Sequence, residues 1–226
     1  MILVLLIALV VLSVAPQWWV RRTMARHREN RPDLPGTGGE LAVHLLREYE
    51  LEGVRVEGGA PAPHYDPESR TIRLDADTWN GRSLTAVAVA AHEFGHALQH
   101  ANGEAGLRLR QFVVKLAAGA QVLVPILLIA APLSGIVLRS PAAALAPLIL
   151  GALVMGLRVL AHLVTLPVEY DASFGKALPI LRDGGYLHGE DLDAARGVLK
   201  AAALTYVAQA AMGLLDIGRW LRGIRF

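Results

Sequence analysis

The residues best suited to chemistry are His92, Glu93 and His96, which lie in the run His-Glu-Phe-Gly-His. Residues four apart lie one above the other on a helix, so both imidazoles can reach one zinc ion. Glu93 is offset by one position and can approach a water that the ion activates, without taking a ligand position. The run therefore predicts a metal site in which a carboxylate serves as general base.

The opposing interpretation is that His92 and His96 are ordinary interior histidines. The residues just before them, 86–91, are all alanine or valine, which predicts a buried helix. A buried helix does not normally carry two histidines and a glutamate unless these groups are paired or bind a metal. The surroundings therefore favour the metal site.

A third protein ligand is not determined by spacing alone. The metzincin pattern requires glycine at position 99 and histidine at position 102, whereas the chain has Gln99 and Asn102. His100 lies two turns beyond His92 and no longer on the same face of the helix, so it is not expected to bind the same ion. A downstream carboxylate is the remaining option, and the candidates are Glu104, Glu169, Asp171, Asp183, Glu190, Asp191, Asp193 and Asp216.

The composition requires part of the chain to lie in a membrane. Of the 226 residues, 54% are hydrophobic and only 19% are charged, and the mean hydropathy is +0.40. In a soluble domain about a quarter of the residues are charged, and a disordered chain lacks such apolar content. The absence of cysteine excludes disulfides and thiolate chemistry. The net charge of +2 gives no sign of nucleic-acid binding.

Apolar stretches predict the membrane spans. Residues 1–20 are interpreted as an N-terminal anchor rather than a signal peptide, because the positive charges follow the apolar run instead of preceding it. Residues 116–138 and 142–166 are long enough to cross a bilayer, so 116–166 predicts a transmembrane hairpin. Residues 201–215 are apolar but short, which favours a helix in the interface or packed on the hairpin over a fourth span.

The distribution of basic residues orients these spans. Five arginines follow the anchor, and Arg108, Arg110 and Lys115 precede the hairpin, whereas only Arg139 lies in its turn. By the positive-inside rule, residues 21–115 are cytoplasmic and the chain re-enters the cytoplasm after the hairpin. We therefore expect a multi-pass protein of the plasma membrane with its active site on the cytoplasmic side.

This topology singles out Glu169 among the candidate carboxylates. The chain returns to the cytoplasmic side immediately before it, and Pro167 is expected to end the third span and start a new helix. Glu169 would then lie in the first turn of that helix, beside the helix of His92 and His96. The alternative is a glutamate that the helix dipole favours at a helix start.

Two helices are expected in the cytoplasmic part. Thr37, with Glu40 three residues later, predicts a capped helix over 38–50. A second helix is expected to begin near Ser83 and to end near Ala101, before an Asn-Gly pair. It carries the metal-binding run.

Four segments of the chain resemble the YugP-like neutral zinc metallopeptidases of bacterial membranes. They read His-Tyr-Asp-Pro at 64–67, Ala-Ala-His-Glu-Phe-Gly-His-Ala-Leu-Gln-His at 90–100, Leu-Pro-Val-Glu-Tyr-Asp-Ala-Ser at 166–173 and Lys-Ala-Ala-Ala-Leu-Thr-Tyr-Val at 200–207. Their order and spacing match over nearly the whole chain. The resemblance implies a glutamate-type zincin on a membrane hairpin. It also implies that His92, His96 and Glu169 hold one Zn²⁺ per chain and that Glu93 is the catalytic base.

The chain is more distantly similar to the HtpX-type membrane proteases and departs from them at one position. The third-ligand segment of those proteases reads Glu-aromatic-x-Ala-Asp, whereas Ser173 takes the place of the aspartate here. A carboxylate that supports a zinc-binding histidine would therefore come from Asp171 or Asp66.

Short strands are predicted by alternating residues at 54–57 and 71–74, while 64–67 leads into a turn. By analogy with the zincin fold, the strand at 71–74 is expected to be the edge that lays an extended peptide beside the zinc.

The group that stabilises the transition state is left open by the sequence. A developing oxyanion needs a hydrogen-bond donor, and the candidates are His64, Tyr65, His162, Tyr170 and Tyr206. Each of them taken singly is better explained as a turn, core or interface residue. Arg158 and His162 share a stripe with Glu169 only if the helix is continuous through Pro167. Both are expected to support the bundle or to reach the membrane interface.

Together these features predict a mostly α membrane protein with a small α+β zincin-like cytoplasmic part. The expected parts are an anchor at 1–20, a cytoplasmic zincin part at 21–115, the transmembrane hairpin at 116–166 and a helical part with the third zinc ligand at 167–226. The predicted function is a zinc-dependent endopeptidase that acts on peptides or on unfolded and membrane-proximal proteins.

The competing hypothesis is a catalytically inactive, zincin-like membrane adaptor with a structural zinc site. A structural zinc site is closed by four protein ligands, whereas a catalytic site keeps one position open. A fourth ligand such as His64 or His100 would favour the adaptor. Three protein ligands with Glu93 near the open position would favour the enzyme.

Overall fold

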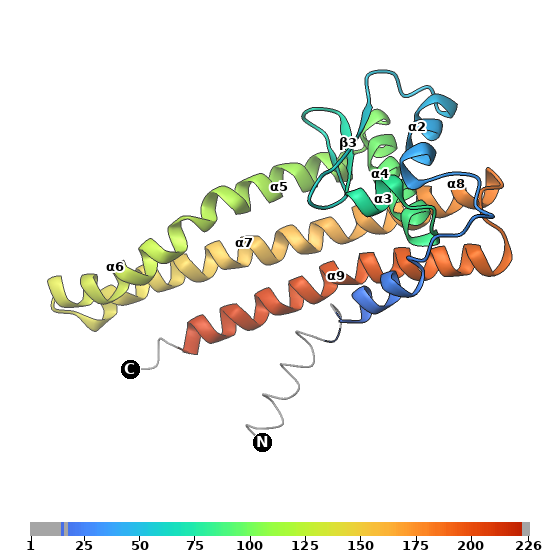
Figure 1. Cartoon of the computed structure of the whole chain (residues 1–226). Helices are drawn as coiled ribbons and strands as arrows, with labels where there is room; N and C mark the ends of the chain where they lie inside the picture. Colours follow the sequence, from blue (N-terminus) through green and yellow to red (C-terminus); the bar gives the residue numbers. More distant parts are fainter. Residues whose placement is uncertain (1–14, 16–17, 223–226) are drawn as a thin grey trace. The chain divides into compact units, whose positions relative to one another are not determined.

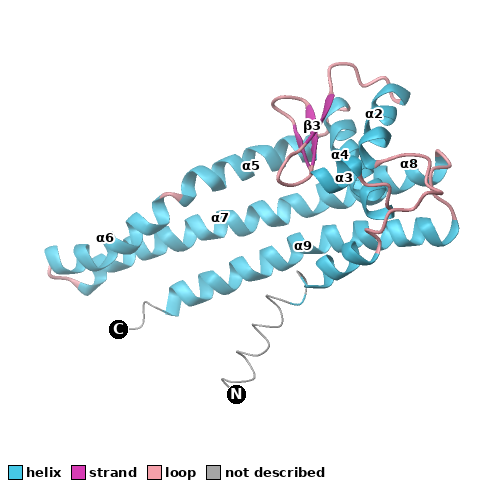
Figure 2. Cartoon of the chain, in the orientation of Figure 1, coloured by secondary structure: helices cyan, strands magenta, loops and turns pink. Residues whose placement is uncertain are grey.

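The computed structural model describes residue 15 and residues 18–222 (Figure 1). The chain divides into two compact units. Unit 1 comprises the described part of Met1–Leu107 and Pro167–Thr205, and unit 2 comprises Arg108–Leu166 and the described part of Tyr206–Phe226. Most of the described residues are helical, and one small sheet lies in unit 1 (Figure 2). The prediction of a mostly α protein with a small α+β part is thereby confirmed. Most of the expected anchor lies outside the described residues.

The first helix of the site-bearing unit is α2, Gly38–Glu48, which begins at the predicted cap. Thr37 Oγ1 accepts a hydrogen bond from the Glu40 amide at 3.1 Å, and Glu40 Oε2 accepts one from the Thr37 amide at 2.7 Å. This capping box satisfies two amides that have no partner within the helix. The buried Leu45 then packs in one cluster with Ile72 of the sheet.

The sheet contains β1 (Arg55–Gly58), β2 (His64–Asp66) and β3 (Thr71–Leu74) in the order β1-β3-β2. β3 pairs in parallel with β1 and antiparallel with β2. Two sequence predictions are therefore wrong. Residues 64–66 form a strand, which is hidden in the sequence because it is short and flanked by prolines. The strand at 71–74 is central, so its edges are already paired and cannot receive a peptide.

The helix that carries the His-Glu-Phe-Gly-His run is α4, Leu84–Ala101, which follows the short α3, Ala76–Asn80. Ser83 Oγ caps α4 by accepting a hydrogen bond from the Ala86 amide at 3.1 Å. The helix ends before Gly103, whose φ of +63° is a conformation that glycine adopts readily. The predicted start and end of this helix are confirmed, and most of its residues are buried.

The third ligand candidate lies on α7, Leu145–Tyr170, which continues into a π-helical segment, η2 (Asp171–Ala177), and then α8 (Leu178–Asp183). Pro167 lies inside α7 rather than at the start of a new helix, so that prediction is wrong. Proline removes one backbone hydrogen bond, but its fixed φ is helical and the helix continues through it. Glu169 is therefore in the last turn of α7 and not in a first turn.

In unit 2, α5 (Ala105–Gln121, assigned to this unit from Arg108 on) meets α6 (Leu123–Val137) at a bend of 41°. The span expected at 116–138 is therefore divided between two helices, which corrects that prediction. Pro125 lies in the first turn of α6 and has no amide hydrogen to continue the α5 ladder, which accounts for the break.

The chain then reverses through a 3-10 turn, η1 (Pro141–Ala144), into α7. Ser134 Oγ donates to the Ala143 carbonyl at 3.0 Å, which ties the end of α6 to this turn. Val113 of α5 packs against Ala161 of α7. Within unit 2, the α5–α6 pair therefore lies antiparallel to α7.

Two stretches, Ala142–Asp183 and Gly189–Gly218, are long and apolar enough to cross a membrane, and the bent α5–α6 pair counts as a third if it forms one span. The last helix, α9 (Gly189–Arg222), has 34 residues. The apolar segment at 201–215 is thus part of a much longer helix, so the expected shortness of this element is wrong. Its placement in the membrane interface stays a prediction.

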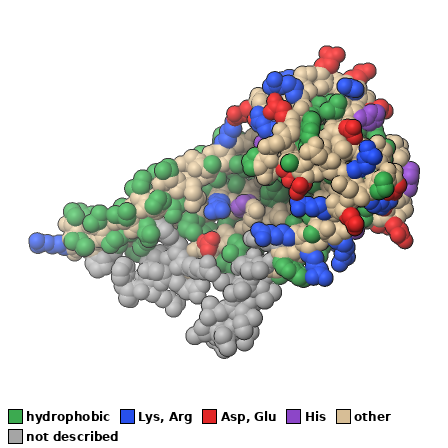
Figure 3. Space-filling view, viewed as in Figure 1, with side chains coloured by type: hydrophobic (Ala, Val, Ile, Leu, Met, Phe, Trp, Pro, Cys, Tyr) green, Lys and Arg blue, Asp and Glu red, His purple; other side chains and the backbone are tan. Residues whose placement is uncertain are grey.

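The exposed side chains of unit 2 are largely apolar. Ile129, Val137 and Leu153 are 62%, 74% and 66% exposed. On the face drawn in Figure 3, hydrophobic side chains cover the helices of unit 2, whereas charged side chains gather over unit 1. Apolar surface of this extent is typical of helices that face hydrocarbon or a partner rather than water.

Candidate metal centre

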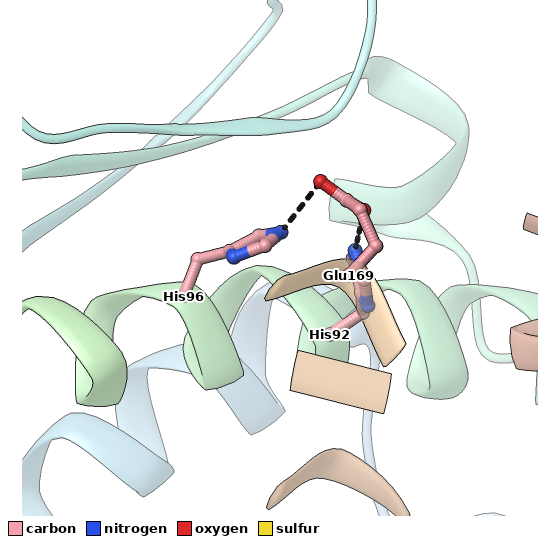
Figure 4. A group of neighbouring side chains, drawn as sticks. All are labelled: His92, His96 and Glu169. Atoms are coloured by element: carbon pink, nitrogen blue, oxygen red, sulfur yellow. Dashed lines mark hydrogen bonds and ion pairs between the residues drawn. The ribbon is translucent and has the colours of Figure 1, made fainter. Parts of the chain in front are cut away.

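Three side chains of unit 1 converge on one point (Figure 4). His92 and His96 extend from α4, and Glu169 extends from the last turn of α7. His92 Nε2 lies 3.2 Å from Glu169 Oε2, and His96 Nε2 lies 3.4 Å from Glu169 Oε1. All three residues are buried, and one donor atom from each lies within 4.8 Å of the others.

A close backbone approach places these elements against each other. A Cβ added at Gly95 would lie 2.6 Å from the carbonyl oxygen of Ala172, so only glycine fits between the two histidines at this point. Ala172 and Ser173 of η2 are completely buried there. The glycine in the His-Glu-Phe-Gly-His run is therefore required by packing, not by the chemistry of the site.

Each histidine is also held through its second ring nitrogen. Ser173 Oγ lies 3.0 Å from His92 Nδ1, and Gln99 Oε1 lies 2.9 Å from His96 Nδ1. Such outer partners orient imidazoles that bind a metal through their other nitrogen. Ser173 thus supports His92 directly, although it replaces the aspartate of the HtpX-type pattern.

The two carboxylates expected to support the histidines have different roles. Asp171 Oδ2 accepts from Gln99 Nε2 at 2.8 Å, so it reaches His96 only through Gln99. Asp66 bonds to Ser69 and to Arg73, each at 2.7 Å. These contacts hold the pKa of Asp66 well below its ordinary value, the Ser69 hydroxyl first and the Arg73 guanidinium next. Asp66 is therefore a sheet residue, and its expected role beside a histidine is wrong.

The donor set fits zinc. Two imidazole nitrogens and one carboxylate are the protein ligands of a common type of catalytic zinc site, which leaves a fourth position open. Within the part of the chain that the structure describes, the group of His92, His96 and Glu169 is the one cluster with this geometry. It includes neither His64 nor His100, whose Nδ1 atoms lie 2.9 Å from the Ala62 carbonyl and 2.7 Å from Tyr65 Oη.

Glu93 follows His92 directly on α4 and is buried. Among the other carboxylates considered from the sequence, Glu104 pairs with Lys176, Asp183 with Arg182 and Asp191 with Arg31. Glu190 and Asp193 are exposed near the start of α9. Asp216 belongs to unit 2. The structure therefore brings only Glu169, of the carboxylates considered as third ligands, into the described metal-binding group.

The candidate donors for a developing oxyanion are dispersed. His64 is exposed, and Tyr170 is 63% exposed. Tyr65 contacts His100 on α4, and burial raises the pKa of Tyr65 to about 12, so its hydroxyl stays protonated at neutral pH. His162 and Tyr206 belong to unit 2. Tyr65 therefore combines a protonated hydroxyl with a contact to α4 in unit 1.

Gln99 is the residue of this site that the sequence does not reveal. It stands three residues after His96 on the same helix, and that spacing is its only local signal. In the sequence it serves merely to exclude the metzincin pattern. Its partners Val168 and Asp171 lie about 70 positions further along the chain, and only the folded structure brings them together.

The chain is similar to known proteins over almost its whole length. The family model described as "Putative neutral zinc metallopeptidase" matches residues 2–225. The chain belongs to this family. It is 35% identical over 219 residues to the protein named "Putative membrane protease YugP" of Bacillus subtilis (strain 168), covering 96% of this chain and 93% of the relative. No solved structure matches. The resemblance inferred from the four sequence segments is thereby confirmed.

Proposed function

We propose that this neutral zinc metallopeptidase family member is a membrane-anchored zinc endopeptidase with one catalytic zinc per chain. The observation that carries the proposal is the convergence of His92, His96 and Glu169 in the interior of unit 1. Two histidines and a glutamate, without a fourth protein ligand in the described group, suit a catalytic site better than a structural one. The name of the Bacillus subtilis relative agrees with a protease at a membrane.

In this proposal three side chains hold the zinc and a fourth, Glu93, transfers protons. His92 and His96 would hold the ion through Nε2, and Glu169 would hold it through its carboxylate, because these are the atoms that converge. Zinc bound there supplies a Lewis acid that allows water to attack at neutral pH. Glu93 takes the proton of that water on its carboxylate and delivers it to the amine that leaves. Its position beside His92 on α4 suits this transfer without adding a ligand.

The location of the site is proposed from the charge pattern. Arginines follow the N-terminal apolar run and basic residues precede the helices of unit 2. By the positive-inside rule, residues 21–115 and the chain after residue 166 would lie on the cytoplasmic side of a plasma membrane that this chain crosses several times. Peptides and unfolded or membrane-proximal proteins are the substrates that such a site would reach.

The test compares zinc content and casein cleavage for the detergent-purified full chain and three variants. Glu93→Gln should keep its zinc and lose about 10²–10⁴-fold in cleavage rate, because a general base contributes that much. Glu169→Ala should lose zinc and activity together. Glu190→Gln, a matched change of an exposed glutamate, should behave as the wild type.

Two results would contradict the proposed endopeptidase. If Glu93→Gln cleaves casein at the wild-type rate, Glu93 is not the base. If the wild type holds one zinc but cleaves no peptide offered, the inactive adaptor with a structural zinc becomes the better account.

A further inference from the structure

The side chain of Gln99 links α4, on which it lies, to the end of α7 and to η2, and it is only 1% exposed. Its Nε2 donates to the Val168 carbonyl at 2.9 Å and to Asp171 Oδ2 at 2.8 Å. A carbonyl and a carboxylate only accept hydrogen bonds, so the amide nitrogen must face them. The amide oxygen of Gln99 is therefore the atom that faces His96.

This orientation fixes the proton on His96. The Gln99 oxygen lies 2.9 Å from His96 Nδ1 and can only accept, so Nδ1 carries the hydrogen and donates it. In a neutral imidazole the other nitrogen, Nε2, then keeps its lone pair. Nε2 is the atom that faces Glu169. Gln99 thus selects the form of His96 that can bind a metal.

The anchor of Gln99 is held by the π-helical segment η2. In a π-helix the backbone bonds run from i to i+5, so residues five apart lie on one face. Lys176 follows Asp171 by five positions, and its Nζ pairs with Asp171 Oδ2. A Cβ at Gly175 would lie 2.2 Å from Asp171 Oδ1, so the glycine leaves room for this carboxylate. In an α-helix the same two residues would point about 140° apart.

Lys176 extends the connection to the chain just after α4. Its side chain is only 11% exposed, and Nζ lies 2.8 Å from Glu104 Oε1 as well as against Asp171. A buried ammonium is costly unless it is paired, so Lys176 keeps its contacts with both carboxylates, which are themselves partly exposed. Asp171 is therefore fixed from both sides, by Gln99 and by Lys176.

We propose that Gln99 is a positioning residue for the metal centre and that η2 is π-helical in order to hold its anchor, Asp171. This inference rests on the proposed zinc site. His92 is held differently, because the Ser173 hydroxyl can either donate or accept and so does not select one form of the ring. The two histidines are thus unequal, and His96 is the one whose metal-binding nitrogen is preset.

The experiment measures the zinc dissociation constant by competition with a chelator, on the purified full chain and three variants. Gln99→Leu removes the amide at nearly constant volume and should weaken zinc binding about 10–100-fold, as loss of an outer partner does. Asp171→Asn keeps the shape of the side chain but weakens its hydrogen bond with Gln99. The zinc affinity of this variant should therefore lie between those of wild type and Gln99→Leu. The visible spectrum of bound Co²⁺ should change in Gln99→Leu, because the imidazole is reoriented.

Ser83→Ala is the matched control. Ser83 caps the same helix, nine positions before His92, so its loss lowers stability through the cap alone. It should leave zinc affinity and the cobalt spectrum unchanged. If Gln99→Leu weakens zinc binding no more than Ser83→Ala does, or leaves the cobalt spectrum as in wild type, Gln99 does not position His96.

Two other outcomes are distinguishable from these. If Gln99→Leu does not fold, Asp171→Asn decides, and wild-type zinc affinity in that variant overturns the proposal. If the wild type itself binds no stoichiometric zinc, the proposed function fails and the positioning role fails with it. Tight zinc binding in wild type and Gln99→Leu alike rejects only the positioning role.

Discussion

In unit 1 the buried side chains include the polar residues His92, Glu93, His96, Gln99 and Glu169, whereas in unit 2 large apolar side chains such as Leu153 and Val137 are exposed. Burying a polar group is costly unless a partner satisfies it. Unit 1 meets this condition with hydrogen bonds at both histidines and at Gln99. Unit 2 instead presents apolar side chains to its surroundings.

This difference indicates that the two units are suited to different surroundings. The interior of unit 1 surrounds its buried polar side chains with partners, which is the environment that the proposed metal ligands and general base require. The surface of unit 2 suits hydrocarbon, where a helix satisfies its own backbone groups. Substitutions in unit 1 should therefore act through internal contacts, and substitutions in unit 2 through the membrane.

The largest effect is expected from a charge on unit 2. Leu153→Lys places an ammonium on α7 at a 66% exposed position and should cost about 3 kcal/mol if that position lies in lipid. Ala62→Lys, at an exposed position of unit 1, should cost nothing measurable. Resistance of the protein to alkaline extraction from membranes reports the difference. Equal extraction of both variants and wild type would show that α7 does not face lipid.

A smaller effect is expected from a methyl group in unit 1. Gly95→Ala places a Cβ 2.6 Å from the Ala172 carbonyl, and the overpacking should cost about 1–3 kcal/mol and lower the melting temperature. Gly119→Ala in unit 2 has no atom within 4 Å of the added Cβ and should be neutral or slightly stabilising. Thermal unfolding in detergent measures both. A Gly95→Ala protein as stable as wild type would contradict the close packing of α4 on η2.

The smallest effect is expected from the half-buried ion pair of the sheet, Asp66 with Arg73. Asp66 bonds to Ser69 and Arg73, and its pKa is lowered in the folded state. The stability it adds is therefore present above its ordinary pKa of about 4 and is lost as the pH falls through the lower, folded value. Asp66→Asn should cost about 1 kcal/mol or less at neutral pH. The difference in melting temperature between wild type and variant should shrink as the pH falls from about 4 toward the lower, folded pKa, and a constant difference would contradict this linkage.

Local sequence signals predict the elements that are fixed by neighbours in the chain. Thr37 and Ser83 cap their helices as expected, because a cap depends on residues only three positions away. Alternation finds β1 and β3. The strand β2 is not predicted, because it has only three residues between prolines. The continuity of α7 through Pro167 is not predicted either, because the other hydrogen bonds of the helix outweigh the one that proline removes.

The candidate site shows the same division. The spacing of His92 and His96 is local, and the sequence predicts it directly. Glu169 lies 77 positions from His92 and is reached only through topology and resemblance, and the structure brings its carboxylate to both rings. Gln99 and the π-helical register of η2 depend on contacts between distant segments. No periodicity in the sequence signals them.

The measurement that tests the central claim most directly is X-ray absorption at the zinc edge on the purified full chain. The account predicts one zinc per chain with two imidazole nitrogens at about 2.0–2.1 Å and oxygen in the remaining positions. Glu169→Ala should lose the ion, and Glu190→Gln should reproduce the wild-type spectrum. Three or more imidazoles per zinc, or zinc retained unchanged in Glu169→Ala, would contradict a centre formed by His92, His96 and Glu169.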